Sequence, residues 1–224
     1  MIKQTIFNDE VLIGISEVSD GNMRFFGGDE TEIIKNQKRL SAEINAKKIA
    51  RLKVVYNRDS YTNYLEINEE NVEEFSIEKS ENDIPTYDGL VTREPDIAFL
   101  LPLADCLGAV IYDPEKKIFG LLHAGRQNIE QEGPKSFIEF IKKQYGSNPK
   151  NIKIYYSPYA LDYRINKLEN KTISNAATEQ LLASGILKEN IIDSKTNTLN
   201  DERFPSHSSG DTSYRFAIVA KMNI

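Results

Sequence analysis

Residues 96–124 read DIAFLLPLADCLGAVIYDPEKKIFGLLHA and form the densest apolar region of the chain. The region divides into DIAFLLPLADC, GAVIYD and KKIFGLLHA, and the Asp113-Pro114 step turns the chain between the last two segments. Each segment has the length and composition of a strand, and so continuous an apolar run is typical of the central strands of a sheet. The sequence therefore predicts three consecutive central strands.

Helices and further strands flank this region without a strict alternation. Asp29 is suited to cap a helix over residues 30–46, and Pro134 is suited to open a second helix that Gly146 stops. A third helix is predicted over 172–184, and further strands over 5–15, 49–56, 61–67, 151–156 and 215–222. This mixture favours a mixed α/β (α+β) fold with layered sheets and helices, and 224 residues suit a single domain, 1–224.

Composition bears on partners and location. The chain has 34 acidic and 28 basic residues, a net charge of −6, and its lysines and glutamates are interleaved, which argues against a nucleic-acid partner. The beginning of the sequence has no apolar core of the length found in signal peptides, and no stretch approaches the roughly 20 apolar residues that cross a bilayer. A single cysteine fits a reducing compartment. We expect a cytoplasmic protein that acts on a small molecule, without a membrane partner.

Cys106 and His123 stand at the ends of predicted strands, where α/β sheets place reactive groups. One strand, a tight turn and a second strand separate them, so a hairpin brings the thiol and the imidazole together. Such a pair ligates a borderline metal such as zinc or copper, or it activates the thiol as a nucleophile. A buried, inert cysteine beside a core histidine is the third interpretation.

Four short motifs around this pair occur in a characteristic order. Asp-Gly-Leu-Val-Thr (88–92), Ala-Asp-Cys (104–106), Tyr-Asp-Pro (112–114) and His-Ala-Gly (123–125) follow one another within 38 residues, and Cys106 and His123 are 17 positions apart. This arrangement resembles the laccase-domain, or YfiH-type, polyphenol oxidase and purine nucleoside phosphorylase family. The segment from Gly28 to Leu40 and Pro205-Ser206-His207 with Arg215 also resemble family segments.

The resemblance implies a fold and a reaction. The fold is an α/β/β/α sandwich with mixed sheets, in a monomer or homodimer. The reaction is metal-assisted phosphorolysis of adenosine, inosine or methylthioadenosine, with adenosine deamination as a companion activity. Cys106 and His123 would hold zinc or copper, and Asp105 would orient a ligand or handle a proton. Arg126 and Arg215 are the candidate phosphate contacts.

Two departures from the family pattern concern the site. Family members use two histidines and one cysteine, with the first histidine in a Q-V-H-G motif, and here Tyr56 stands at that histidine position. Tyr56 as an oxygen ligand or proton-transfer group, His207 as the third ligand, and loss of the metal site are the three interpretations. Ser208-Ser209 replaces an expected arginine pair, which weakens phosphate capture.

Other functions remain open beside phosphorolysis. The first alternative is a metal-free cysteine hydrolase or deamidase that uses Cys106 and His123. The second is a degenerate pseudoenzyme with a binding role. An oxidase ranks last, because blue-copper oxidases need many histidines and this chain has two.

Overall fold

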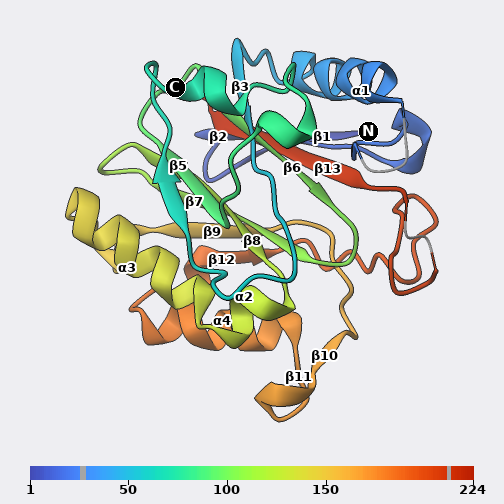
Figure 1. The fold of residues 1–224 in the computed structure, drawn as a ribbon. Coiled ribbons are helices and arrows are strands. Elements are labelled where there is room, and N and C mark those ends of the chain that lie inside the picture. Colours follow the sequence, from blue (N-terminus) through green and yellow to red (C-terminus); the bar gives the residue numbers. More distant parts are fainter. Residues whose placement is uncertain (26–28, 211–212) are drawn as a thin grey trace.

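The computed structural model describes residues 1–25, 29–210 and 213–224, which form two β-sheets packed face to face with helices outside them (Figure 1). In sheet order, the five-stranded sheet consists of β1 (Ile2–Ile6), β2 (Val11–Ile15), β13 (Phe216–Met222), β6 (Ile97–Leu103) and β3 (Lys48–Arg51). The six-stranded sheet consists of β12 (Ile191–Asp193), β9 (Lys153–Tyr156), β7 (Leu107–Asp113), β8 (Ile118–Ala124), β5 (Gly89–Thr92) and β4 (Tyr64–Glu66). Parallel and antiparallel pairs occur in both sheets.

The helices lie on opposite outer faces of the sheet pair (Figure 1). Helix α1 (Glu30–Ala42) covers the five-stranded sheet, and α2 (Arg126–Glu130), α3 (Gly133–Tyr145) and α4 (Ile173–Ala183) lie on the six-stranded side. A small ribbon, β10 (Arg164–Ile165) with β11 (Lys171–Thr172), projects beyond α4. Short 3-10 turns occur at Val18–Asp20, Val72–Phe75, Glu81–Asp83, Pro149–Asn151, Asn166–Leu168 and Lys188–Asn190. The predicted α/β/β/α sandwich with mixed sheets is confirmed.

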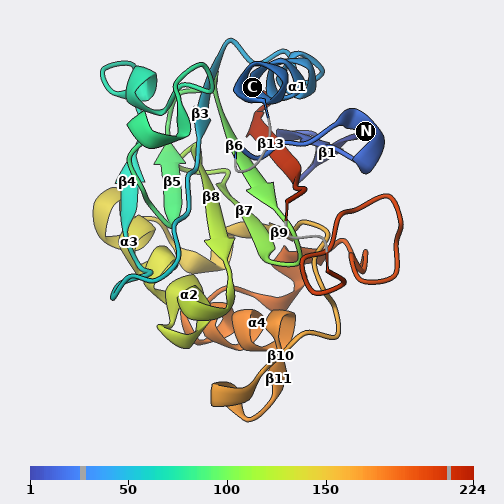
Figure 2. The ribbon, with the colours of Figure 1, turned by 45° about the vertical axis from the view of Figure 1, so that its right-hand side comes forward.

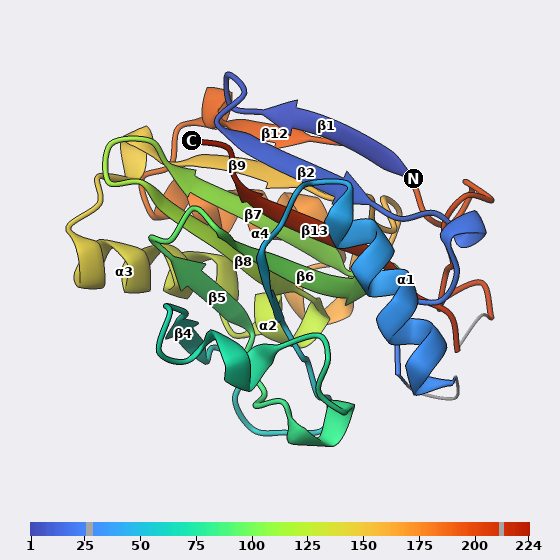
Figure 3. The same ribbon diagram turned by 90° about the horizontal axis from the view of Figure 1, so that it is seen from above.

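Alternation along the central strands explains the layers. In β6, Phe99 and Leu101 pack into the core between the sheets, whereas Leu100 packs with the α1 side. Full burial of a side chain of this size contributes about 2–3 kcal/mol. Seen from above, the strands of the two sheets run in nearly the same direction (Figure 3), which is the aligned mode of sheet packing.

The predicted hairpin is formed by β7 and β8, which pair antiparallel from Leu107–Ala124 to Asp113–Ile118. Leu121 packs into the core between the sheets, and Leu122 packs on the side of α3. His123 lies two residues beyond Leu121 and therefore faces the space between the sheets, at the open end of the hairpin.

Local sequence sets the helix ends largely as predicted. The Asp29 carboxylate accepts a hydrogen bond from the Thr31 amide and caps α1. Pro134 lies in the first turn of α3. Gly146 ends that helix with φ +66°, a left-handed conformation that glycine adopts without the steric penalty of a Cβ. Gly28, part of the family-like segment, lies outside the described residues.

Four predicted boundaries differ from the structure. The single strand expected over 5–15 is the hairpin β1–β2, because residues 7–9 turn the chain with positive φ at each position. The helix expected to reach residue 46 ends at Ala42, and a left-handed Asn45 follows. The strands expected over 49–56 and 61–67 shrink to β3 and β4. Helix α2 was not predicted.

Within the described ranges, no helix combines the length and the apolar character that crossing a bilayer requires.

Candidate functional site

The turn between β6 and β7 carries Cys106 and takes the chain from one sheet to the other. Asp105 forms this turn with φ +70°, a conformation that aspartate tolerates better than most residues. Cys106 packs against the core between the sheets. The thiol therefore lies at the end of the inter-sheet space. Figure 2 shows β6 and β7 side by side at the turn that joins them.

Tyr56 lies between the two predicted reactive residues. Its hydroxyl is 3.9 Å from Cys106 Sγ, and its ring packs edge-on against the His123 imidazole with the ring centroids 6.3 Å apart. His123 pairs with Gly108 across the hairpin, so it lies on the same sheet face as the residue two positions before Gly108, which is Cys106. The hairpin thus places the thiol and the imidazole on one face, with Tyr56 in contact with both.

Gly125 provides the surface on which the imidazole lies. A Cβ at residue 125 would come within 2.6 Å of His123 Cε1 and 3.2 Å of its Nε2. No side chain fits there without displacing the ring. Glycine in the His-Ala-Gly motif therefore permits the observed position of His123.

Cys106, His123 and Tyr56 are all uncharged near neutral pH. Burial raises the pKa of the Cys106 thiol to about 11 and, helped by the charge of Arg58, lowers the pKa of His123 to about 4. The nearby Cys106 sulfur, and then burial, raise the pKa of Tyr56. Nδ1 of His123 is buried and has no hydrogen-bond partner in the part of the chain that the structure describes. The site thus presents a protonated thiol, a protonated phenol and a neutral imidazole.

A pocket of about 460 Å³ opens beside Cys106, a volume typical of small-molecule sites. Arg24, Arg126 and Arg215 line it, and they concentrate positive charge in a protein of net charge −6. The remaining wall consists of Tyr56, Ala104, Asp105, Cys106, Gln127, Tyr163, Ile173, His207 and Ser208. All the predicted site residues except His123 line this pocket. His123 lines a smaller adjoining cavity that shares Arg24, Tyr56 and Arg215 with it.

One asparagine positions two of the arginines. The Asn22 side-chain oxygen accepts hydrogen bonds from the amides of Arg24 and Arg215, each at 3.0 Å. The Met23 amide donates to the Arg215 carbonyl at 3.0 Å. Arg24 was missed from the sequence, because only this tertiary contact brings its segment to the start of β13. Tyr163 and Gln127 were also missed.

Arg126 and His207 occupy the solvent side of the pocket. Arg126 begins α2, is exposed, and lies 3.8 Å from Glu130. His207 is also exposed and belongs to the segment before residue 211. Both residues are therefore placed to meet a ligand at its entry.

Asp105 holds the segment that carries His207. Its carboxylate accepts hydrogen bonds from the hydroxyls of Thr198 (2.8 Å) and Ser206 (3.1 Å) and from the Ser208 amide (2.7 Å). All three partners come from the stretch after β12. Through these contacts Asp105 positions the segment that carries His207. The role predicted from the sequence is a different one, in which Asp105 orients a ligand or transfers a proton.

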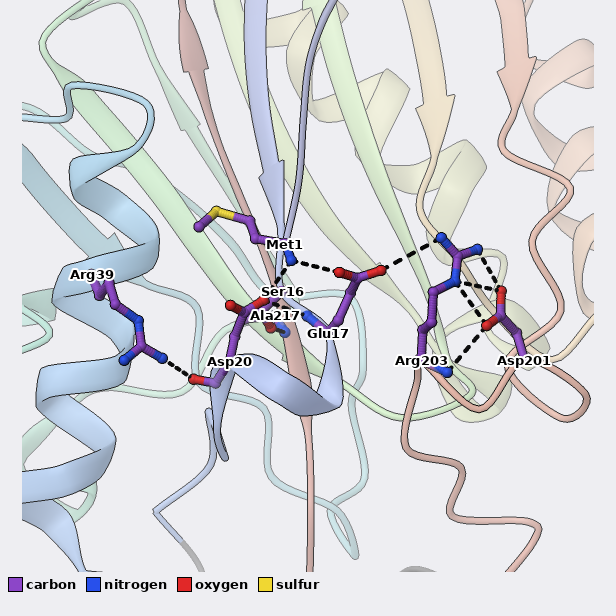
Figure 4. Close-up of polar contacts among 8 residues, drawn as sticks. All are labelled: Met1, Ser16, Glu17, Asp20, Arg39, Asp201, Arg203 and Ala217. Carbon is purple, nitrogen blue, oxygen red and sulfur yellow. Dashed lines mark hydrogen bonds and ion pairs between the residues drawn. The ribbon is translucent and has the colours of Figure 1, made fainter.

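Ion pairs anchor the middle of the same stretch (Figure 4). Arg203 binds Asp201 through two of its nitrogens and lies 3.5 Å from Glu17. Glu17 in turn accepts from the amino group of Met1. Residues 198–208 are thus fixed to both the turn of Asp105 and the segment after β2.

The loop of Tyr56 is fixed from the opposite side. Arg58 forms an ion pair with the fully buried Asp88 and donates to the Val55 carbonyl at 2.7 Å. Gln131, just after α2, accepts from the Tyr61 amide at 2.8 Å. These contacts connect Tyr56 to β5 and to the helix that carries Arg126.

Comparison with known proteins identifies the family. A family model described as multi-copper polyphenol oxidoreductase laccase matches residues 12–166, more than half of the chain. The chain belongs to this family. The laccase family match includes Tyr56, Cys106, His123 and Arg126, whereas Arg215 and His207 lie beyond its end.

Individual relatives of the laccase family carry a phosphorylase name. A protein of Borreliella burgdorferi named purine nucleoside phosphorylase is 33% identical over 97 residues, which cover 42% of this chain and 42% of that protein. Purine nucleoside phosphorylase YlmD of Bacillus subtilis is 33% identical over 85 residues, 35% of this chain and 30% of that protein. These matches thus span less than half the length of each relative.

The sandwich fold of this chain resembles that of a solved structure. The crystal structure of YlmD from Geobacillus stearothermophilus superimposes with a TM-score of 0.86 at 17% identity, over 96% of this chain and 93% of that one. At 17% identity, this structural similarity establishes the fold alone.

The laccase family name suggests metal binding, so we tested the donor set. Within the ranges that the structure describes, no group of three or more His, Cys, Asp or Glu side chains is arranged to hold a metal ion. Cys106 and His123 supply one thiol and one imidazole, Tyr56 supplies a phenol, and Asp105 is occupied by three donors. Zinc sites use four ligands, or three and a water, drawn from thiolate, imidazole and carboxylate. The residues present do not fit the zinc or copper site expected from the sequence.

Proposed function

We propose that this protein is a purine nucleoside phosphorylase that cleaves the N-glycosidic bond of adenosine, inosine or methylthioadenosine. A phosphate oxygen bonds to C1′ of the ribose, the bond from C1′ to the purine nitrogen breaks, and the purine takes up a proton. The products are the free base and ribose 1-phosphate, or 5-methylthioribose 1-phosphate when the substrate is methylthioadenosine. No step is assigned to zinc or copper, because the donor set is incomplete.

One observation carries the proposal: three arginines and two tyrosines line a single pocket of about 460 Å³ beside Cys106. Arginine binds phosphate through paired, charge-assisted hydrogen bonds. Tyr56 and Tyr163 offer aromatic surface to a purine ring. A nucleoside together with phosphate suits both features and the volume of the pocket.

The reacting purine needs a proton donor, and the site has two. Because the pKa values of Cys106 and Tyr56 are raised, both groups keep their protons at neutral pH. Cys106 Sγ is the donor we assign to the departing purine, with Tyr56 positioned to return a proton to it. The phosphorylase names of the relatives are consistent with this reaction.

The test is a product assay with adenosine and with inosine. Wild-type protein should release free base and ribose 1-phosphate in equal amounts, only when phosphate is added, and the same chromatograms measure conversion of adenosine to inosine. Cys106→Ala should abolish base release. Base release by the wild type that is no faster than by Cys106→Ala, or that ignores phosphate, contradicts the proposal.

The alternative of a cysteine hydrolase is less well supported. Attack by sulfur requires a thiolate, usually paired with a charged imidazole. Burial instead keeps the Cys106 thiol protonated and His123 neutral. Iodoacetamide distinguishes the two: a hydrolase thiol reacts quickly at pH 6, whereas the thiol in this structure should react slowly.

A further inference from the structure

The position of Tyr56 relative to Cys106 and His123 has a consequence for metal binding. Tyr56 stands where the family-like sequence pattern has a histidine, and its side chain reaches the two residues that would be the other ligands. The separation of 3.9 Å between the Tyr56 hydroxyl and Cys106 Sγ is close to the distance between two ligands of one tetrahedral zinc, about 3.5 Å for bonds of 2.0–2.3 Å. The side chain of residue 56 therefore reaches both Cys106 and His123, and a phenol stands where the family-like pattern has an imidazole.

The other polar groups nearby do not complete the set. Both oxygens of Asp105 are engaged by Thr198, Ser206 and the Ser208 amide. His207 is exposed on the solvent side of the pocket. A neutral phenol is not among the ligands that zinc sites use.

We propose that this protein does not retain zinc or copper, and that a single change, Tyr56→His, creates a metal site formed by residue 56, Cys106 and His123. The imidazole of His123 is prepared for such a role. It lies against the bare backbone of Gly125, and its buried Nδ1 has no hydrogen-bond partner among the described residues. Cys106 and His123 thus lie on one face at the open end of the hairpin, and a third ligand is lacking.

The experiment measures metal content and affinity in the full chain, purified without a histidine tag. Wild type, Tyr56→His, Tyr56→Phe and the double variant Tyr56→His with Cys106→Ala are each exposed to excess zinc or copper and then dialysed. We expect about one equivalent of zinc in Tyr56→His and substoichiometric metal in the other three. The affinity of Tyr56→His should exceed that of wild type by at least the roughly 100-fold that even an outer-shell partner contributes.

Two further readouts are independent of activity. Cobalt bound by Tyr56→His should show the visible absorption of a tetrahedral thiolate complex, and wild type should not. Zinc should raise the thermal midpoint of Tyr56→His alone, because a ligand that binds only the folded state stabilises it. The midpoint without metal also reports whether each variant is folded.

Two results overturn the proposal. One is a full equivalent of zinc or copper retained by wild type and lost in Cys106→Ala, which would mean that Tyr56 or another residue completes the site. The other is a folded Tyr56→His variant that binds metal no better than Tyr56→Phe, which would mean that residue 56 is not at a ligand position. Neither result bears on the phosphate-dependent assay above, so the two proposals fail separately.

Discussion

The β7–β8 hairpin and the loops that line the neighbouring pocket are held in place differently. The hairpin is fixed by seven consecutive residue pairs and is buried along both strands. The opposite wall depends on single side-chain contacts, such as the Asn22 oxygen that holds the amides of Arg24 and Arg215. Cys106 and His123 thus lie at the open end of a buried hairpin, whereas Arg24 and Arg215 lie on loops, an arrangement in which recognition changes more easily than chemistry.

The largest effect should follow from the hairpin. Cys106→Ala removes the proposed proton donor without breaking a backbone pair, so we expect kcat to fall by about 100-fold or more. The free energy of unfolding, measured by urea denaturation, should change far less than the activity. Cys106→Ser, which restores an O–H donor, should recover part of the rate. Full activity in Cys106→Ala would place the chemistry elsewhere in the pocket.

The second largest effect on activity should come from replacing the arginines that line the pocket. Arg215→Ala and Arg24→Ala each remove a charge-assisted contact, so we expect the KM for phosphate to rise about 10- to 100-fold with a smaller change in kcat. Arg126→Ala should have less effect, because Arg126 is exposed and near Glu130. Arg164→Ala, outside the pocket, is the matched control. Equal KM values for Arg164→Ala and Arg215→Ala would show that Arg215 does not contribute to phosphate binding.

Substitutions of Asn22 test whether its side-chain contacts alone hold Arg24 and Arg215 in the pocket wall. Asn22→Ala removes the acceptor for two amides, so we expect a loss of about 1–2 kcal/mol in the free energy of unfolding. The KM for phosphate should rise as well, although neither arginine has been changed. Asn22→Asp keeps an acceptor oxygen and should retain most of both properties. An Asn22→Ala protein with unaltered KM would show that the wall has other supports.

The smallest effect concerns the anchor of residues 198–208. Arg203 lowers the pKa of Asp201, so the folded state is favoured while Asp201 is ionised and loses that contribution as the pH falls through the lowered pKa. Asp201→Asn should therefore lower the free energy of unfolding by about 0.5 kcal/mol at pH 7. The difference from wild type should shrink as the pH falls below the usual aspartate pKa of about 3.9, because Asp201 then becomes protonated in the folded state as well. Urea denaturation over a series of acidic pH values measures it, and a difference that does not decrease with pH would assign the effect to packing.

The same comparison explains what the sequence revealed. The hairpin, and with it the placement of Cys106 and His123 on one face, was predictable because two apolar runs flank a single Asp-Pro turn. The turn at Phe7, Asn8 and Asp9 was not, because it lacks Gly and Pro, although Asn and Asp tolerate its positive φ values. Arg24 and Tyr163 lie far from the motifs along the chain. Only tertiary contacts bring them to the pocket.

The absence of a side chain at Gly125 restricts which substitutions are tolerated next to His123. Gly146 has open space around the position of a missing Cβ, so only its φ of +66° opposes replacement. Gly125 has an ordinary φ of −82°, and what forbids a methyl group there is the ring of His123 lying on it. A side chain at residue 125 therefore displaces the His123 ring, and this constraint disappears when residue 123 carries no ring. The residues at positions 123 and 125 are thus coupled through the space that the imidazole occupies.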